Sequence, residues 1–121
     1  MVRYFAYRGN METNKAIAAL AALAAASRLE VYRLLVRAGP EGMSAGRIAE
    51  ATNTPPSSLS FHLKELAHAG LVTSRQESRF VIYSANYPTM NELLGFLTEN
   101  CCQGEPCAVV PASECTTCGD K

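Results

Sequence analysis

The sequence has no tryptophan, no cysteine before residue 101, and no net charge, because 11 Lys and Arg residues balance 11 Asp and Glu residues. A chain of 121 residues forms one domain. A domain of this size without tryptophan has little apolar side-chain volume to spare in its core. Hydrophobic residues are 48% and charged residues 18%, which excludes a chain that is disordered for want of apolar side chains. The zero net charge, taken alone, argues against nucleic-acid binding, which usually selects basic chains.

The charges are distributed unevenly, and this removes the force of that argument. Residues 1–40 carry six basic and two acidic side chains, and residues 41–86 carry four of each. Residues 87–121 carry one lysine against five acidic side chains. The neutral total therefore combines a basic N-terminal third with an acidic tail.

The lack of upstream cysteines excludes a disulfide framework. All five cysteines lie in the last 21 residues, whereas a disulfide-stapled fold needs them, usually in even number, throughout its body. We therefore expect a reducing, cytoplasmic compartment in which the thiols are free for other chemistry.

Long hydrophobic runs are lacking as well. The apolar run over residues 16–26 is mostly alanine and only 11 residues long, too short to span a bilayer. It resembles the apolar part of a signal peptide, but alanine is a good helix former and a weak hydrophobe, which favours a helix of the folded domain. We expect no membrane partner.

Hydrophobic periodicity and turn residues predict a series of short elements. Helices are expected over residues 14–25, between Ser27 and Gly39, over 45–51 and over 55–69, with Ser27, Ser44 and Thr54 as N-caps. Two strands follow, 71–75 and 79–83, and a last helix covers 88–101. The expected inward side chains are Leu29, Tyr32, Leu35, Val36, Ile48, Ala49, Leu59, Leu63 and Leu66. We divide the chain into a leader (1–13), a folded domain (14–102) and a cysteine-containing tail (103–121).

This order, α-α-α-α-β-β-α, is typical of a mainly α fold with a β-hairpin wing, the winged helix-turn-helix. The first and last helices are rich in alanine and leucine and flank the rest. Two copies of the chain would bury these helices against each other in a C2 dimer, and the alternative is an intramolecular core.

The helix over residues 55–69 has the composition of a DNA-recognition helix. Its outer face carries Ser57, Ser58, Ser60, Phe61 and Lys64. Short hydroxyl side chains suit a surface laid in a major groove, because they bond to phosphates and base edges without bulk. Phe61 is placed to touch a thymine methyl group or to fold back on the protein.

Two arginines, Arg75 and Arg79, lie in the predicted hairpin. We expect them to reach phosphate or the minor groove of double-stranded DNA. The alternative is that they only deter pairing of the sheet edge with other chains.

Four segments carry a resemblance to a known family. They are Ser27-Arg28-Leu29, the run from Ser58 to Leu66, Ala69-Gly70-Leu71-Val72, and the run from Arg79 to Tyr83. On these residues the chain resembles the ArsR/SmtB family of metal-sensing winged-helix repressors, over roughly residues 14–102. The resemblance implies a homodimer joined by its first and last helices that binds a palindromic operator. It also carries DNA contacts onto Ser57, Ser58, Ser60, Phe61 and the wing arginines.

The sequence departs from the family at two positions of the recognition helix. The family often has Gln where Pro56 stands and His where Phe61 stands. Base readout here therefore rests on fewer hydrogen bonds, and the family does not indicate the operator sequence.

The resemblance also indicates where a ligand is held. One of the family's sites is absent, since residues 42–45 contain no Cys-x-Cys pair. A zinc site on the last helix is disfavoured, since that helix has Glu92 and Glu99 but no histidine. What remains is Cys101, Cys102 and Cys107. This cluster resembles a subset of arsenite repressors whose three thiols lie at the end of the last helix.

The chemistry of three thiolates favours As(III) or Sb(III) as the inorganic inducer. Both ions are soft, and both are pyramidal because a lone pair occupies the fourth direction. Zn²⁺ prefers four tetrahedral ligands, and Cys115 or Cys118 could supply the fourth, so a Zn-, Cd- or Pb-responsive site stays an alternative. A structural zinc is a further alternative.

Other functions stay open at this point. A thiol-redox-responsive repressor would use the same scaffold, and Cys115 and Cys118 form a CxxC pair that suits a metal contact, a tail disulfide or no role. An enzyme is disfavoured, since the sequence has no P-loop, no His-Glu-x-x-His and no catalytic-cysteine loop with a trailing arginine. A winged helix that binds protein and not DNA is the last alternative.

Overall fold

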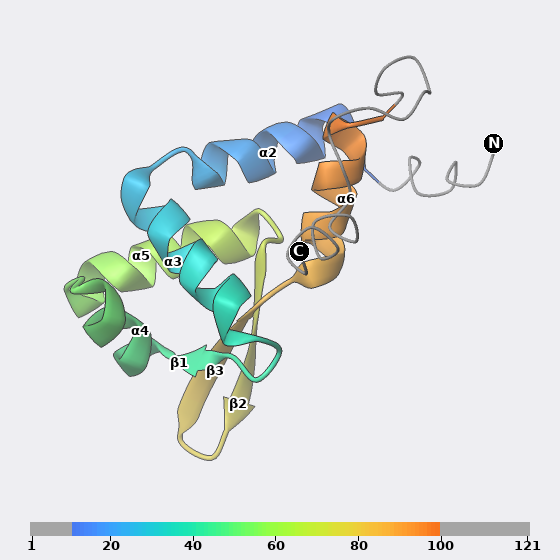
Figure 1. The fold of residues 1–121 in the computed structure, drawn as a ribbon. Helices are drawn as coiled ribbons and strands as arrows, with labels where there is room; N and C mark the ends of the chain where they lie inside the picture. Colours follow the sequence, from blue (N-terminus) through green and yellow to red (C-terminus); the bar gives the residue numbers. More distant parts are fainter. Residues whose placement is uncertain (1–10, 100–121) are drawn as a thin grey trace, which may run out of the picture.

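Two helices meet at a corner near the start of the computed structural model, which describes residues 11–99. They are α2 (Thr13–Leu23) and α3 (Ala26–Ala38), joined through an extended Ala25 with φ −147° and ψ 133° (Figure 1). The prediction of Ser27 as the N-cap of α3 is wrong, because Ala25 holds that position. Nε of Arg28 donates to the Ala22 carbonyl at the end of α2 (2.7 Å). This hydrogen bond fixes the corner between the two helices, so α3 begins before Ser27.

The first helix of the helix-turn-helix unit is α4 (Ala45–Thr52). The hydroxyl of Ser44 accepts a hydrogen bond from the Arg47 amide (3.4 Å), which confirms the predicted N-cap. Asn53 ends α4 in the left-handed conformation, with φ 54°, which asparagine tolerates better than most residues.

The second helix of the unit is α5 (Pro56–His68), which begins one residue later than predicted. The prediction of Thr54 as its N-cap is wrong. The Thr54 hydroxyl lies 2.8 Å from the Thr52 hydroxyl and so stays within the turn, while Pro55 holds the N-cap position.

The wing consists of β2 (Val72–Glu77) and β3 (Phe80–Ala85), which pair antiparallel. Only Ser78 and Arg79 connect them, since Glu77 pairs with Phe80. Ser78 adopts a left-handed φ of 58°, which closes this tight loop. The first strand therefore runs two residues further into the hairpin than predicted, whereas β3 begins one residue later and ends two residues later than predicted.

A third strand, β1 (Met43–Ser44), was not predicted, because two residues carry no periodic signal. It pairs with β3, with Met43 opposite Tyr83, so the sheet order is β1-β3-β2. Gly42 permits this close approach. Its φ is 73°, and a Cβ atom there would overlap the carbonyl oxygen of Tyr83.

The last helix, α6 (Tyr87–Leu97), begins where the Asn86 side chain accepts a hydrogen bond from the Thr89 amide (3.4 Å). The prediction extended this helix to residue 101 and is wrong at that end. The Thr98 hydroxyl donates to the Leu94 carbonyl (2.8 Å), which competes with continued helix at this point.

The core lies where α3, α4 and α5 meet the sheet. Its largest fully buried side chains are Val31, Leu35, Ile48, Leu59, Leu63, Leu66 and Leu71. The predicted inward stripe of α5 is confirmed, and so are Tyr32, Leu35 and Ile48. Leu29 was predicted to face inward, but 42% of it is exposed, because the buried face of α3 is centred on Val31 and Leu35.

The α2 helix packs through its small residues. Ala16, Ala19 and Ala22 are buried, whereas Ile17 and Leu20 are 56% and 42% exposed. Alanines at spacings of three allow the α2 backbone to approach its neighbours closely and turn its larger apolar side chains to the surface.

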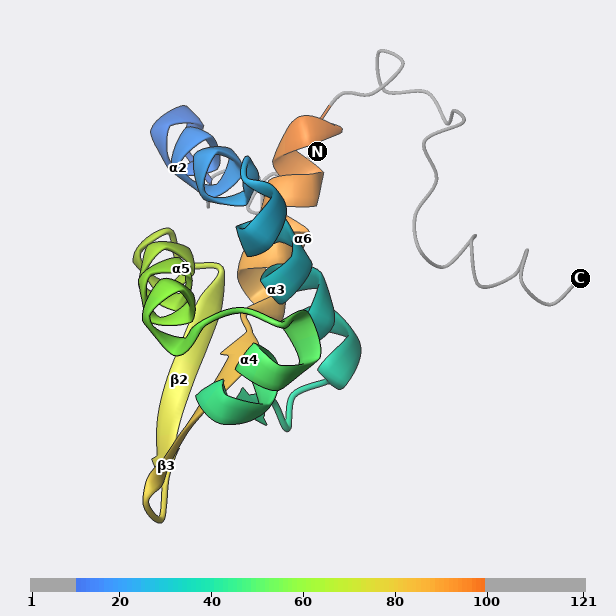
Figure 2. The ribbon, with the colours of Figure 1, turned by 90° about the vertical axis from the view of Figure 1, so that its left-hand side faces the viewer.

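The two ends of the molecule are formed by different elements. The tip of the wing lies at one end, and α2 and α6 lie side by side at the opposite end in both views (Figures 1 and 2). The core starts within the segment assigned to a leader, because Met11 is buried and α2 begins at Thr13. Within residues 11–99, no helix has the length and apolar character needed to cross a membrane.

Candidate nucleic-acid interface

The α5 helix divides its side chains between the core and the surface as the sequence predicts. The five residues of this helix that were assigned to DNA contact are all exposed: Ser57, Ser58, Ser60, Phe61 and Lys64. The side chains on the opposite face are fully buried in the core. This partition fixes the rotation of α5, so its hydroxyls and its lysine all face solvent.

The start of α5 adds hydrogen-bond donors to this surface. The first amides of an α-helix have no intrahelical acceptor, and no side chain caps α5. Ser57 and Ser58 therefore present N–H groups as well as hydroxyl groups. Such a helix start favours phosphate oxygens through its free donors and its dipole.

Phe61 is 53% exposed in the middle of this polar face. Its ring meets that of His62 edge to face, with centroids 5.9 Å apart and an interplanar angle of 61°. Nδ1 of His62 is buried without a hydrogen-bond partner among the described residues. Phe61 thus packs edge to face against His62 while about half of its surface stays available for an apolar contact.

The two wing arginines occupy different environments. Arg79 lies in the loop at the wing tip, is exposed, and makes no hydrogen bond or ion pair within residues 11–99. The guanidinium group of Arg75 is already held by acceptors of the protein, among them the Glu41 carbonyl at 2.7 Å. DNA contact by either residue stays a prediction, but Arg79 is the one whose donors are free.

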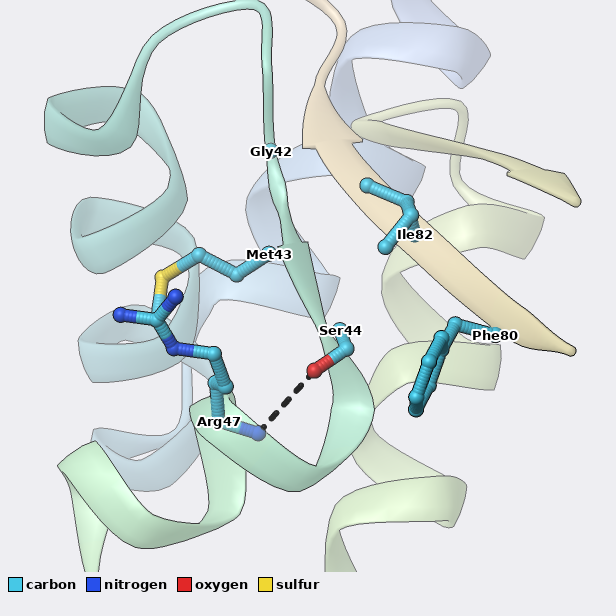
Figure 3. Close-up of a pocket in the computed structure, with 6 residues that line it drawn as sticks. All are labelled: Gly42, Met43, Ser44, Arg47, Phe80 and Ile82. Carbon is cyan, nitrogen blue, oxygen red and sulfur yellow. Dashed lines mark hydrogen bonds between the residues drawn. The ribbon is translucent and has the colours of Figure 1, made fainter. Parts of the chain in front are cut away.

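A cleft of about 430 Å³ lies between the wing and the start of α4 (Figure 3). Met43 and Ser44 line it on one side, Phe80 and Ile82 on the other. Phe80 is 57% exposed, and its ring points toward Ser44 in Figure 3.

Sequence reasoning missed one basic residue at this cleft. Arg47 is exposed on α4 and lies beside Met43, next to the hydrogen-bonded Ser44 (Figure 3). It adds an exposed cation at the start of α4, beside Met43 of β1. The signal was available, since the first helix of a helix-turn-helix unit crosses the DNA backbone and Arg47 is the basic residue of α4.

A second exposed surface lies at the other end of the molecule. On α2 it comprises Ile17 and Leu20, and on α6 it comprises Leu94 and Leu97, each 54% exposed. The two helices contact each other, and we call these four exposed side chains together the α2–α6 face. Exposed apolar groups of this kind mark interaction sites when they gather in one place.

The predicted ligand cysteines, Cys101, Cys102, Cys107, Cys115 and Cys118, lie outside the described residues. Within residues 11–99, no group of three or more His, Cys, Asp or Glu side chains is placed to hold a metal ion. The thiol site therefore stays a prediction from the sequence.

Comparison with known proteins agrees with this arrangement. Residues 23–75 match a family described as a helix-turn-helix domain. The chain is similar to the uncharacterized HTH-type transcriptional regulator YceK of Bacillus subtilis (strain 168), with 38% identity over 77 residues. That alignment covers 63% of this chain and 76% of YceK.

Solved structures show the same fold. HlyU from Vibrio cholerae N16961 is 31% identical with a TM-score of 0.57, over 77% of this chain and 100% of HlyU. An ArsR-like transcriptional regulator from Rhodococcus sp. RHA1 is 20% identical with a TM-score of 0.67, over 88% and 92% of the two chains. The homodimeric winged helix-turn-helix DNA-binding domain Mb0332 of Mycobacterium bovis, a possible ArsR-family regulator, is 21% identical with a TM-score of 0.57, over 78% and 88%. The chain therefore belongs to the helix-turn-helix transcriptional regulators, and its winged-helix fold is the one found in ArsR-like regulators.

Proposed function

We propose that the protein is a homodimeric transcriptional repressor that leaves its operator when As(III) or Sb(III) binds Cys101, Cys102 and Cys107. The observation that carries the proposal is the position of three clustered thiols directly after α6, the helix that contributes Leu94 and Leu97 to the exposed apolar face. In this proposal, a ligand at these thiols acts next to the dimer interface, which α2 and α6 form.

The DNA-binding half of the proposal rests on the exposed face of α5 and on Arg79. In a dimer, two α5 helices enter successive major grooves about 34 Å apart, and each wing follows the backbone beside them. The serine hydroxyls and Lys64 bind phosphates and base edges, and Phe61 makes the apolar contact.

The dimer half of the proposal rests on the α2–α6 face. Isolated exposed leucines are common, but four large apolar side chains on two touching helices favour burial against an identical face. The Mycobacterium bovis domain of the same fold is homodimeric, which supports a homodimer here. The face lies opposite the wing tip, so pairing through it leaves both DNA-binding surfaces free (Figures 1 and 2).

The donor set is what supports As(III) or Sb(III) as the ligand. Three thiolates fit a soft, three-coordinate ion, whereas zinc takes a fourth ligand, which Cys115 or Cys118 would supply. Bound near the end of α6, the ligand favours a dimer geometry whose recognition helices no longer match successive grooves. By linkage, operator DNA must weaken ligand binding by the same factor.

The test is operator binding with and without arsenite, using an operator selected from random duplex DNA. We expect arsenite to weaken binding by the wild type about 5- to 150-fold, the usual range of such coupling. Cys102→Ser should stay bound, while the matched control Cys118→Ser should be released like the wild type.

Each other outcome indicates an alternative. Unchanged release of Cys102→Ser by arsenite would contradict the thiol site. Release by Zn²⁺ or Cd²⁺ that requires Cys118 indicates a four-thiolate site. Release by peroxide without arsenite indicates a thiol-redox sensor.

A further inference from the structure

The Arg75 side chain makes four hydrogen bonds inside the protein. Nη2 donates to the Glu41 carbonyl (2.7 Å), and Nη1 donates to the Pro40 carbonyl (3.5 Å) and to the Ser84 hydroxyl (3.3 Å). Nε donates to the carboxylate of Glu77 (2.7 Å). The planar guanidinium fork thus meets acceptors from three separate parts of the chain, an arrangement suited to arginine and not to lysine.

These contacts join the outer strand of the wing to the turn between α3 and β1, and β1 leads directly into α4 of the helix-turn-helix unit. Arg75 lies on β2, and β3 separates β2 from β1. To reach Pro40 and Glu41, which directly precede β1, the side chain crosses β3. The residues it joins are 34 and 35 positions apart in the chain, so the bridge is a long-range tertiary contact.

The acceptors on the far side belong to a rigid turn. The Gly42 amide donates to the Gly39 carbonyl (3.1 Å), and both glycines have a positive φ, which sets the directions of the carbonyls between them. Ser84 on β3 is buried, and its hydroxyl donates to the Pro40 carbonyl (3.1 Å) while it accepts from Arg75. Arg75, Ser84 and the turn therefore form one closed network at the root of the wing.

We propose that Arg75 is a positioning residue that holds the wing at a fixed angle to the helix-turn-helix unit and thereby presents Arg79 to the DNA backbone. It acts through the wing and not through a phosphate contact of its own, because four of its five N–H donors are already engaged by acceptors of the protein. This inference rests on the proposed operator binding, in which Arg79 makes the contact.

The decisive experiment is a double-mutant cycle on operator affinity with Arg75→Gln, Arg79→Gln and the double variant. We expect Arg75→Gln to weaken binding about tenfold, the equivalent of one charged hydrogen-bond network. In the Arg79→Gln background the same change should cost almost nothing, because the contact that Arg75 positions is already gone. Additive losses would overturn the inference, since they indicate an independent DNA contact.

A conservative variant provides a second discrimination. Arg75→Lys keeps the charge but loses the fork, so we expect it to bind the operator as weakly as Arg75→Gln. Full affinity of Arg75→Lys would show a simple phosphate contact and would overturn the inference as well.

A readout in the free protein separates this inference from the proposed function. Amide hydrogen exchange of β2 and β3 should accelerate in Arg75→Gln and in Ser84→Ala, and should stay unchanged in Arg79→Gln. Unchanged exchange in Arg75→Gln would overturn the bridge even if operator binding is confirmed. Failure of the wild type to bind any operator would contradict the proposed function and leave the exchange result as the measure of the bridge.

Discussion

At the scale of single residues, two tyrosines on neighbouring elements differ in how their hydroxyls are satisfied. The Tyr87 hydroxyl donates to the Val36 carbonyl (2.9 Å) at the end of α3. The Tyr32 hydroxyl is buried without a hydrogen-bond partner among the described residues. Burial raises the pKa of Tyr32 above the ordinary 10.0, and the neighbouring Tyr87 adds to the rise.

We predict opposite effects of removing the two hydroxyls. Tyr87→Phe should lower the free energy of unfolding by about 1 kcal/mol, because it leaves a buried carbonyl without its donor. Tyr32→Phe should raise it by up to about 1 kcal/mol, because it removes an unsatisfied polar atom. Urea denaturation at one fixed protein concentration measures both, and destabilisation by Tyr32→Phe would indicate a hydrogen bond to that hydroxyl.

The raised pKa of Tyr32 also predicts a pH dependence. Below pH 10 its hydroxyl is protonated in the folded and unfolded states, so stability does not depend on it. Above that pH the unfolded chain loses the proton first, and the free energy of unfolding falls until the pH passes the folded-state pKa. Denaturation in alkaline buffers should show this decline in the wild type and a smaller decline in Tyr32→Phe.

At the scale of elements, two glycines beside the helix-turn-helix unit have different roles. Gly42 lies against β3 at a φ of 73°, and a Cβ atom there would overlap the Tyr83 carbonyl and crowd Ser84. Gly46 lies in α4, and a Cβ atom there would meet nothing within 4 Å. Only the first glycine is required by the pairing of β1 with β3.

We predict that Gly42→Ala destabilises the fold by more than about 1 kcal/mol, because both its φ and its surroundings exclude a side chain. Gly46→Ala is the matched control and should stabilise by up to about 1 kcal/mol, because alanine is the better helix former. Thermal denaturation distinguishes the two. Equal stability of Gly42→Ala and the wild type would contradict the observed register of β1.

At the scale of the whole molecule, six of the eight exposed large apolar side chains of residues 11–99 lie on α2 and α6 or on the wing, at opposite ends. Leu94 and Leu97 belong to the α2–α6 face, and Phe80 and Val81 lie on the wing. The proposed dimer uses the first group and leaves the second beside the DNA.

We predict that Leu97→Glu shifts the protein from dimer to monomer at micromolar concentration, because it places a charge without a partner in the seam. Val81→Glu removes an exposed apolar group of similar kind from the wing and should leave the dimer intact. Sedimentation equilibrium measures both. A dimeric Leu97→Glu would place the seam elsewhere, while a monomeric wild type would contradict the homodimer.

The sequence by itself determined the order of the helices and the hairpin, the Ser44 cap and the buried stripe of α5. These features depend on periodicity, turn residues and caps, which act between residues close together in the chain. The exposure of the α5 residues assigned to DNA contact followed from the same stripe, because they lie on the opposite face of the helix.

Only the tertiary structure decided the rest. The pairing of β1, the exposure of Leu29, the apolar face left by the alanines of α2 and the bridge from Arg75 were not predictable from local pattern. A periodic pattern shows that a helix has an apolar face, but the neighbouring elements decide which side chains of that face are covered. For the same reason, a hairpin arginine that suits DNA contact in the sequence is engaged in the fold by carbonyls 34 and 35 positions away.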